Sequence, residues 1–274
     1  PAGHVFDKVL FASYGNPDGI CGSFTLGSCN SATSQSVVEG LLLGNNSATL
    51  TASNGFFGDP CMGINKRLYI QARFAPVQAK DLTVNNNNGA LTNGVTYDIS
   101  GGGSWSFDGT NDYIEVLHSA SIFPSDNFCV QFWIYQKRAA PGLEVPVSKY
   151  ASGSQGWLFV VDNYTMSFDG RNNTADGYKS AASSTPMVLN NWYHFVGVKS
   201  GLNMYIYQNG ILAGSTTWTT PGVLATNTRY LNIGKVESSS YSFSNITDVR
   251  MYNRVLSASE ILAYYNASKS RYGL

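Results

Sequence analysis

The sequence predicts a mainly β protein with two domains, a small α/β domain followed by an antiparallel β-sandwich. From Trp105 onward, short segments alternate apolar and polar residues, and each ends in Gly, Asn, Asp, Ser or Pro. Regular short strands without intervening helices are typical of antiparallel sandwiches. An α/β pattern, in contrast, is confined to the first seventy-five residues or so, in the usual size range of a small domain.

The boundary between the domains is expected where the composition changes. Residues 85–89 (four Asn and a Gly) and residues 101–103 (three Gly) interrupt regular structure. We therefore expect a first domain at 1–76, a linker with the first sandwich strand at 77–104, and a second domain at 105–274. Residues 91–99 are the expected first strand.

Charge excludes two classes of partner. Lys+Arg and Asp+Glu both number 17, the net charge is +0, and only 12% of residues are charged. A nucleic-acid-binding protein needs a basic face, and no Lys/Arg run suits an anionic membrane. No apolar run approaches membrane-spanning length. We therefore expect no nucleic acid and no membrane insertion, and an aromatic content of 13% with 28 Gly is typical of β-rich extracellular or virion proteins.

In the first domain, alternation predicts strands at 8–12, 48–52 and 67–74. A helix is expected at 34–43, with Ser36 and Glu39 as a capping box and Gly44 as its end.

The second domain contains most of the expected strands. An Asn209-Gly210 turn between alternating flanks predicts a hairpin. Ser257 and Glu260 form a capping box that predicts a short C-terminal helix. The expected strands are 105–107, 113–116, 128–135, 156–161, 165–168, 192–199, 204–208, 230–233 and 246–252.

A polar turn at 56–66 is the feature most suggestive of function. Gly58 and Gly63 permit positive φ, and the turn carries Asp59, Lys66 and Cys61. An acid and a base held on a rigid loop suit a neutral polyhydroxylated ligand, because Asp accepts from hydroxyls and Lys donates to them. On these residues alone, an ordinary polar turn with a structural cysteine remains an alternative.

Four cysteines are present, at 21, 29, 61 and 129. None forms a Cys-x-x-Cys or Cys/His cluster, which excludes a typical zinc site. One disulfide among Cys21, Cys29 and Cys61 is consistent with the sequence. Cys129 lies in an apolar strand and is expected to be a buried free thiol.

The first domain resembles a known family. Residues 9–23, with Tyr14-Gly15, and residues 57–61, with Gly58-Asp59-Pro60-Cys61, are similar to the galactose/rhamnose-binding lectin domain of the SUEL type, over roughly residues 5–75. That domain also ends some β-galactosidases as a non-catalytic module.

The resemblance implies a monosaccharide site beside the Gly-Asp-Pro-Cys turn. Tyr14, Asn54, Asp59 and Lys66 match its sugar-contacting positions. Tyr14 would supply a flat apolar face with a polar tip.

The resemblance also implies one retained disulfide and several departures. The retained pair is Cys29–Cys61, and Cys21 has lost its partner. Asn16 stands where animal relatives carry Arg. Loss of family cysteines fits a protein made in a reducing cytosol.

The second domain resembles the laminin-G-like, concanavalin A-like jelly roll. Motifs at 89–94, 104–114, 191–196, 207–210 and 248–261 occur in the order of that family, over roughly residues 80–268. The full expectation is thus a small α/β lectin domain followed by an antiparallel jelly-roll β-sandwich. The sequence is also similar to modules of bacteriophage structural and tail-fibre proteins.

The jelly-roll resemblance implies a Ca²⁺ site in many members. Asp108 and Asp248 are the candidate oxygen ligands. The alternative, which we favour, is that Asp108 and Asp112 shape an Asp-Gly-Thr-Asn turn.

No catalytic constellation is visible in the sequence. The paired carboxylates of a glycosidase are absent, Glu115, Glu144 and Glu237 are isolated, and the three His are unclustered. We therefore expect a non-enzyme.

The sequence predicts a carbohydrate-binding protein of a phage virion surface, as a tail-fibre or capsid-decoration component. Its expected partners are cell-surface glycans, other virion proteins and further copies of itself in a homo-oligomer. An extracellular location is the alternative setting. The alternative functions are a purely structural capsid or tail protein, and the non-catalytic region of a secreted glycoside hydrolase.

Overall fold

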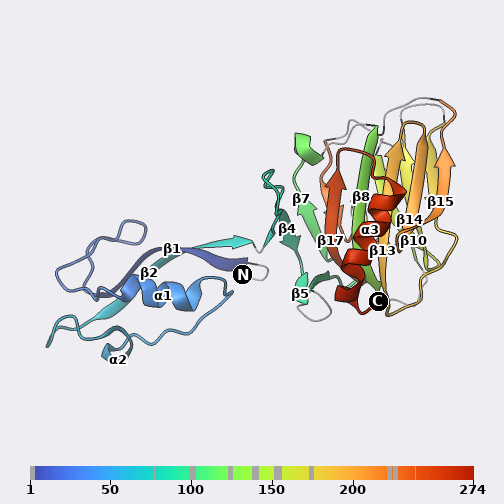
Figure 1. Ribbon diagram of the computed structural model, residues 1–274. Helices are drawn as coiled ribbons and strands as arrows, with labels where there is room; N and C mark the ends of the chain where they lie inside the picture. Colours follow the sequence, from blue (N-terminus) through green and yellow to red (C-terminus); the bar gives the residue numbers. More distant parts are fainter. Residues whose placement is uncertain are drawn as a thin grey trace. The chain divides into compact units, whose positions relative to one another are not determined.

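The computed structural model divides the chain into two compact units, Pro1–Val77 and Gln78–Leu274 (Figure 1). Each unit has its own hydrophobic core. The residues described by the structure are 4–76, 78–98, 103–122, 126–137, 142–150, 156–172, 176–220, 224, 228–237 and 239–274.

The first unit is built on two long antiparallel strands, β1 (His4–Gly15) and β2 (Arg67–Pro76). Between them in sequence lie α1 (Ser34–Leu42) and the single turn α2 (Asn54–Phe57). Both helices bury apolar side chains against the sheet, because two strands alone cannot enclose a core. The core residues are Val9, Ala12, Tyr14, Val38, Leu42 and Phe57.

The start of α1 differs from the expected capping box. The helix begins at Ser34, two residues before Ser36, and its N-cap Thr33 makes no side-chain cap. Instead, the Ser34 hydroxyl accepts a hydrogen bond from the backbone amide of Tyr14, at 2.9 Å. The helix start is therefore fixed by contact with β1.

The strand expected at 48–52 does not form. The described residues between Gly44 and Ser53 contain no strand, and β1 pairs only with β2. Leu50 is the one large apolar side chain of that segment, and it packs against the core without strand pairing. The polar turn thus follows the short helix α2 and not a strand.

A disulfide connects the two loops of the first unit. Cys29 and Cys61, the pair implied by the family resemblance, are bonded with their Cα atoms 5.9 Å apart. Cys29 is buried, whereas Cys21 is free and exposed.

The second unit is a sandwich of two antiparallel sheets (Figure 1). One has the order β12 (Tyr178–Ala182), β11 (Thr165–Arg171), β10 (Gly156–Asp162), β9 (Val147–Lys149), β16 (Leu231–Ile233), β7 (Tyr113–Val116), β4 (Gly89–Thr92) and β3 (Gln78–Ala79). The other has the order β15 (Ile211–Thr217), β14 (Asn203–Gln208), β13 (Trp192–Ser200), β8 (Asn127–Gln136), β17 (Ser244–Tyr252), β6 (Ser104–Ser106) and β5 (Thr96–Asp98). The antiparallel sandwich predicted by the strand pattern is confirmed.

The region 77–104 holds more structure than expected. The strand predicted at 91–99 is divided into β4 and β5 by a turn in which Asn93 has φ 64°. Three further strands, β3, β9 and β12, were not predicted, because β3 and β9 have only two and three residues and β12 is mostly Ser, Ala and Lys. The Asn209-Gly210 hairpin forms as predicted, with both residues at positive φ.

The strand β8 is buried on both faces. Phe128, Val130, Phe132 and Ile134 point into the main core between the sheets. On the outer face, Cys129 is a buried free thiol, as predicted, and burial raises its pKa to about 11. Since Cys129 is buried, other elements must cover the outer face of β8.

The C-terminal helix α3 (Ala258–Ser268) and the 3-10 helix η3 (Lys269–Tyr272) cover that outer face. Ser257 and Glu260 form the predicted capping box at the start of α3. Beneath the two helices, Trp133 stacks on Tyr265 and on Tyr272. Among the described residues, no helix is both long and apolar enough to cross a membrane.

His194 of β13 lies inside this aromatic layer. Its side chain is fully buried against Trp133 and Tyr264, and neither ring nitrogen has a hydrogen-bond partner among the described residues. Burial lowers the pKa of His194 to about 3. The folded unit therefore requires a neutral imidazole.

We predict that removing the disulfide destabilises the first unit selectively. It closes a loop between residues 32 apart, so the Cys29→Ser/Cys61→Ser double variant should lose about 4 kcal/mol of the free energy of unfolding. Amide hydrogen exchange in β1 and β2 measures this loss. All Trp residues lie at 105 or beyond, so the Trp fluorescence melt serves as the internal control. The prediction would be contradicted if the Trp fluorescence melt of the double variant shifted while amide exchange in β1 and β2 stayed unchanged.

The burial of His194 predicts that the free energy of unfolding of the second unit depends on pH. Since the folded pKa of His194 lies below the ordinary 6.5, the unfolded chain takes up a proton first as pH falls, and stability decreases below pH 6.5. Between pH 6.5 and 4 this contribution amounts to about 3 kcal/mol. We expect His194→Leu to flatten that part of the profile by about this amount. The free energy of unfolding, followed by Trp fluorescence, measures it. Superimposable slopes would refute the assignment.

Candidate functional site

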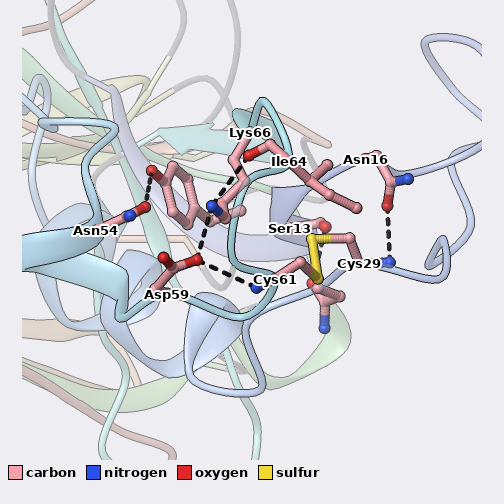
Figure 2. The surroundings of a disulfide bond; sticks show 10 residues. Ser13, Asn16, Cys29, Asn54, Asp59, Cys61, Ile64 and Lys66 are labelled. Carbon is pink, nitrogen blue, oxygen red and sulfur yellow. Dashed lines mark hydrogen bonds and ion pairs between the residues drawn. A yellow bond between two sulfur atoms is a disulfide. The ribbon is translucent and has the colours of Figure 1, made fainter.

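The polar turn after α2 is held by an ion pair. Lys66 Nζ lies 2.7 Å from Asp59 Oδ1 and donates a second hydrogen bond to the Ile64 carbonyl, at 3.0 Å (Figure 2). The backbone amide of Cys61 also donates to Asp59 Oδ1, at 3.2 Å. Gly58 and Gly63 have φ of 79° and 77°, which fits the tight path of the turn. The Asp59 carboxylate and the Lys66 ammonium therefore face each other.

Tyr14 and Asn54 form the second half of the site. The Tyr14 hydroxyl donates to Asn54 Oδ1, at 2.8 Å, and connects the end of β1 with the start of α2. Lys66 immediately precedes Arg67, which pairs with Gly15 beside Tyr14. Strand pairing thus brings Tyr14 and Lys66 close together, and their bonds to Asn54 and Asp59 complete the set selected from the sequence. Figure 2 shows Asn54, Asp59 and Lys66 on one side of the disulfide.

The role expected for the Tyr14 ring is wrong. The residue is only 4% exposed and stacks on Phe57 with ring centroids 5.1 Å apart, so its face belongs to the core of the unit. Tyr14 can act on a ligand only through the position of Asn54. The sequence alone does not show that the Tyr14 ring is buried, because a tyrosine at a strand end points inward or outward according to register.

Phe56 is a residue that the sequence analysis missed. It lies on α2 two residues after Asn54 and is 48% exposed, whereas its neighbour Phe57 is buried. An exposed aromatic ring beside polar groups is a suitable surface for the apolar face of a sugar. The only signal in the sequence was the Phe-Phe pair, and a single helical turn decides which ring is outside.

Each of the three polar residues retains unused hydrogen-bonding capacity among the described residues. Asp59 Oδ2, the amide nitrogen of Asn54 and one N–H of the Lys66 ammonium make no hydrogen bond there. The site thus has one anionic acceptor and two donors, which are held by bonds to other protein atoms; the Asp59 side chain is 39% exposed, whereas the Lys66 side chain is only 5% exposed.

Asp59 remains ionised at mildly acidic pH. The hydrogen bond from Lys66 lowers the pKa of this carboxyl below its ordinary value, and the backbone amide of Cys61 adds to the effect. The acceptor is therefore charged throughout the neutral range, and binding a hydroxyl would require no proton transfer.

Asn16, at the position of the family's Arg, has a structural role. The side-chain Oδ1 of Asn16 accepts a hydrogen bond from the backbone amide of Cys29 at 2.7 Å, and the backbone amide of Asn16 donates to the Cys29 carbonyl at 3.0 Å. The residue therefore braces the disulfide loop.

The two aspartates considered for Ca²⁺ are engaged by other groups. Asp108 Oδ1 accepts from the backbone amides of Thr110, at 2.8 Å, and Asn111, at 3.3 Å. Although burial alone would raise it, these bonds leave the pKa of Asp108 below its ordinary value. Asp112 accepts from the backbone amide of Gly94, at 2.6 Å. This is the turn-forming arrangement that we favoured as the alternative.

Asp248 is held by a basic residue and a tyrosine. Its carboxylate accepts from Arg250 Nε, at 2.6 Å, and from the Tyr264 hydroxyl of α3. Within the described ranges, no group of three or more His, Cys, Asp and Glu could hold a metal ion. The donor set around Asp108 and Asp248 therefore does not fit a two-carboxylate Ca²⁺ site.

Buried acids of the sandwich also have structural partners. Glu144 accepts from Gln136 Nε2 at 2.8 Å and from the backbone amide of Phe243 at 2.9 Å. Asp169 accepts from the Tyr178 hydroxyl. These bonds explain why isolated acids are buried in this unit.

Two known families match the chain. Residues 1–74 match the D-galactoside/L-rhamnose binding SUEL lectin domain. Residues 108–262 match the concanavalin A-like lectin/glucanases superfamily, described as Laminin_G_3.

Curated relatives match the first unit alone. Beta-galactosidase 8 of Arabidopsis thaliana is 44% identical over 68 residues, or 25% of this chain and 8% of that protein. Beta-galactosidase 6 of Oryza sativa subsp. japonica is 37% identical over 70 residues, or 26% of this chain and 8% of that protein. The chain thus spans less than a tenth of the length of these relatives.

Solved structures resemble the second unit in fold. The binding domain of Paraclostridial Mosquitocidal Protein 1 has a TM-score of 0.61 at 20% identity, covering 69% of this chain and 49% of that one. The botulinum neurotoxin serotype D binding domain has a TM-score of 0.58 at 17% identity, covering 69% and 48%. The SUEL match contributes the lectin domain at the amino end, and the match over residues 108–262 spans more than half of the 274 residues. The chain therefore belongs to the concanavalin A-like lectin/glucanases superfamily.

Proposed function

We propose that the protein is a non-enzymatic carbohydrate-recognition protein that binds a galactose- or rhamnose-type monosaccharide at Asn54, Asp59 and Lys66. One observation carries the proposal: the three side chains are fixed by bonds to the protein, yet each keeps a free donor or acceptor. A sugar has neighbouring hydroxyls that both donate and accept, so this set complements it without moving a proton. Phe56 would supply the apolar surface first assigned to Tyr14.

Affinity at such a site is expected to be low. A single shallow monosaccharide site binds with a Kd of about a millimolar, or about −4 kcal/mol. Presentation of many copies would raise the avidity by orders of magnitude without new contacts. A multivalent assembly, as a homo-oligomer or an array, is therefore part of the proposal.

The setting of the protein is a separate proposal. A phage virion surface, with other virion proteins as neighbours, has no support from the relatives, and an extracellular location is the alternative. The plant β-galactosidases favour a different setting, in which the lectin unit accompanies a catalytic region elsewhere in a longer chain. The mass of the intact native protein distinguishes these settings, because a hydrolase would be several times longer than 274 residues.

We predict that Asp59→Ala and Lys66→Ala each abolish retention on immobilised galactose or rhamnose. A lost hydrogen bond to a charged group costs about 2 kcal/mol, roughly a thirtyfold loss from an already weak site. The Trp melt should remain nearly unchanged because all Trp lie in the other unit.

Asp18→Ala and Lys8→Ala are the matched controls, since both residues are exposed on the same unit. Amide exchange of β1 and β2 shows whether each variant is folded. Full retention of both site variants would place the site elsewhere. If the unmodified protein, displayed multivalently, binds no sugar on a glycan array, the alternative of a structural protein with lectin folds is favoured.

For the metal, we predict that EDTA leaves the melting temperature of the second unit unchanged, because Asp108 and Asp248 are engaged by protein donors. A decrease that added Ca²⁺ reverses would restore these aspartates as Ca²⁺ ligands. Differential scanning calorimetry with and without EDTA measures the shift, and Mg²⁺ addition serves as the control for general ionic effects.

A further inference from the structure

A groove of about 900 Å³ opens within the second unit, and all of its lining residues belong to that unit. One wall consists of six consecutive residues of β17, Thr247–Tyr252. The opposite wall comes from the other sheet, with side chains of β7 and β16 and the segment that follows β3. The groove therefore runs along a strand and between the edges of the two sheets.

Among the described residues, the β17 wall is an open strand edge. On one side, β17 pairs with β8 as far as Tyr252. On the other side, β6 pairs with it only at Asn245 and Ile246, and no other described strand neighbours it there. Alternate backbone N–H and C=O groups beyond Ile246 therefore point into the groove without a strand partner.

The side chains of this edge alternate in character. Val249 and Met251 pack against the main core between the sheets. Arg250 and Tyr252 lie on the outer face, where Arg250 covers the Tyr264 ring and Tyr252 joins the outer cluster. A strand added beside them would place every second side chain among apolar residues. The apolar residues of the opposite wall are Ile114, Val116, Ile122, Leu231 and Ile233.

A rigid loop borders the same groove. Asp81 accepts from the backbone amides of Thr83 and Asn87, both at 2.9 Å, and Asn87 Nδ2 donates to the Ser121 hydroxyl at 2.9 Å. The loop nevertheless leaves Leu82 96% exposed at the rim. An exposed aliphatic side chain on a braced loop is typical of a contact surface.

The open charges of the groove are positive. Its two aspartates have partners: Asp81 as above, and Asp248 in its bonds with Arg250 and Tyr264. Lys80 and Arg271 also line the groove, are exposed, and have no ion pair among the described residues. The groove is thus complementary to a ligand with apolar side chains on one face and carboxylates on the other.

We propose that this groove binds an extended acidic segment of a partner polypeptide, which adds as a strand to the open edge of β17. Main-chain hydrogen bonds to Val249–Tyr252 would supply affinity, and alternate apolar side chains would enter between the sheets. Carboxylates on the outer face would meet Arg271 of η3, which lies on that face. The open strand edge favours a peptide over a small apolar molecule, which has no use for a row of backbone donors and acceptors.

The test uses the full chain and synthetic peptides of about six residues, the usual length of a strand. The probe alternates Val with Glu and has blocked ends. One control replaces Glu with Lys, and another carries N-methyl groups on alternate amides, which removes main-chain donors. Fluorescence anisotropy measures affinity, and amide hydrogen exchange locates the contact.

We expect the Val/Glu peptide to bind and to slow exchange of the amides of Val249–Tyr252, and both control peptides to bind at least about tenfold more weakly. Arg271→Glu should weaken the Val/Glu peptide by about tenfold. Lys179→Glu, on β12 at the far edge of its sheet, should leave affinity unchanged.

Three outcomes would overturn the proposal. Equal binding of the N-methylated peptide would indicate an apolar ligand pocket in place of strand addition. Unchanged affinity in Arg271→Glu would remove the charged rim from the site. Absence of binding at about 1 mM peptide, the limit of a useful interaction, would show that this edge is closed.

Discussion

The disulfide between Cys29 and Cys61 is the constraint on which the first unit depends. A two-stranded sheet has too little apolar surface to fix the long loops between its strands. The disulfide joins the loop after β1 to the polar turn, and Asn16 braces it by two hydrogen bonds to Cys29. With the turn anchored, the Asp59–Lys66 pair is held in place, which would lower the entropic cost of binding at the proposed sugar site.

The second unit is stabilised by two apolar layers. Its main core lies between the sheets, and α3 adds a second apolar layer on the outer face of β8. That double burial permits an unpartnered His194 in the aromatic layer, since a neutral ring fits there and a charged one does not.

Strand pattern and turn residues were sufficient to predict the sandwich, the Asn209-Gly210 hairpin and the capped C-terminal helix. They could not predict which way Tyr14 faces, because a single residue of register moves a side chain from core to surface. They also failed at 48–52, where alternation with Leu50 as the single large apolar side chain did not produce a strand. The resemblance to the SUEL lectin family selected Tyr14, Asn54, Asp59 and Lys66, but only the fold shows which of their polar atoms make no hydrogen bond among the described residues.

The two proposed sites rely on different physical chemistry. The sugar site gains specificity from three fixed polar groups and gains little affinity from area, so it depends on multiplicity. The groove at β17 depends on backbone groups with which the described residues of β5 and β6 do not pair, since the pairing of β6 with β17 ends at Ile246. A partner strand at that edge would join each copy of the chain to a larger assembly. Such an assembly would give a weak monosaccharide site the repeated presentation that it requires, so the edge of β17 and the polar turn would act together.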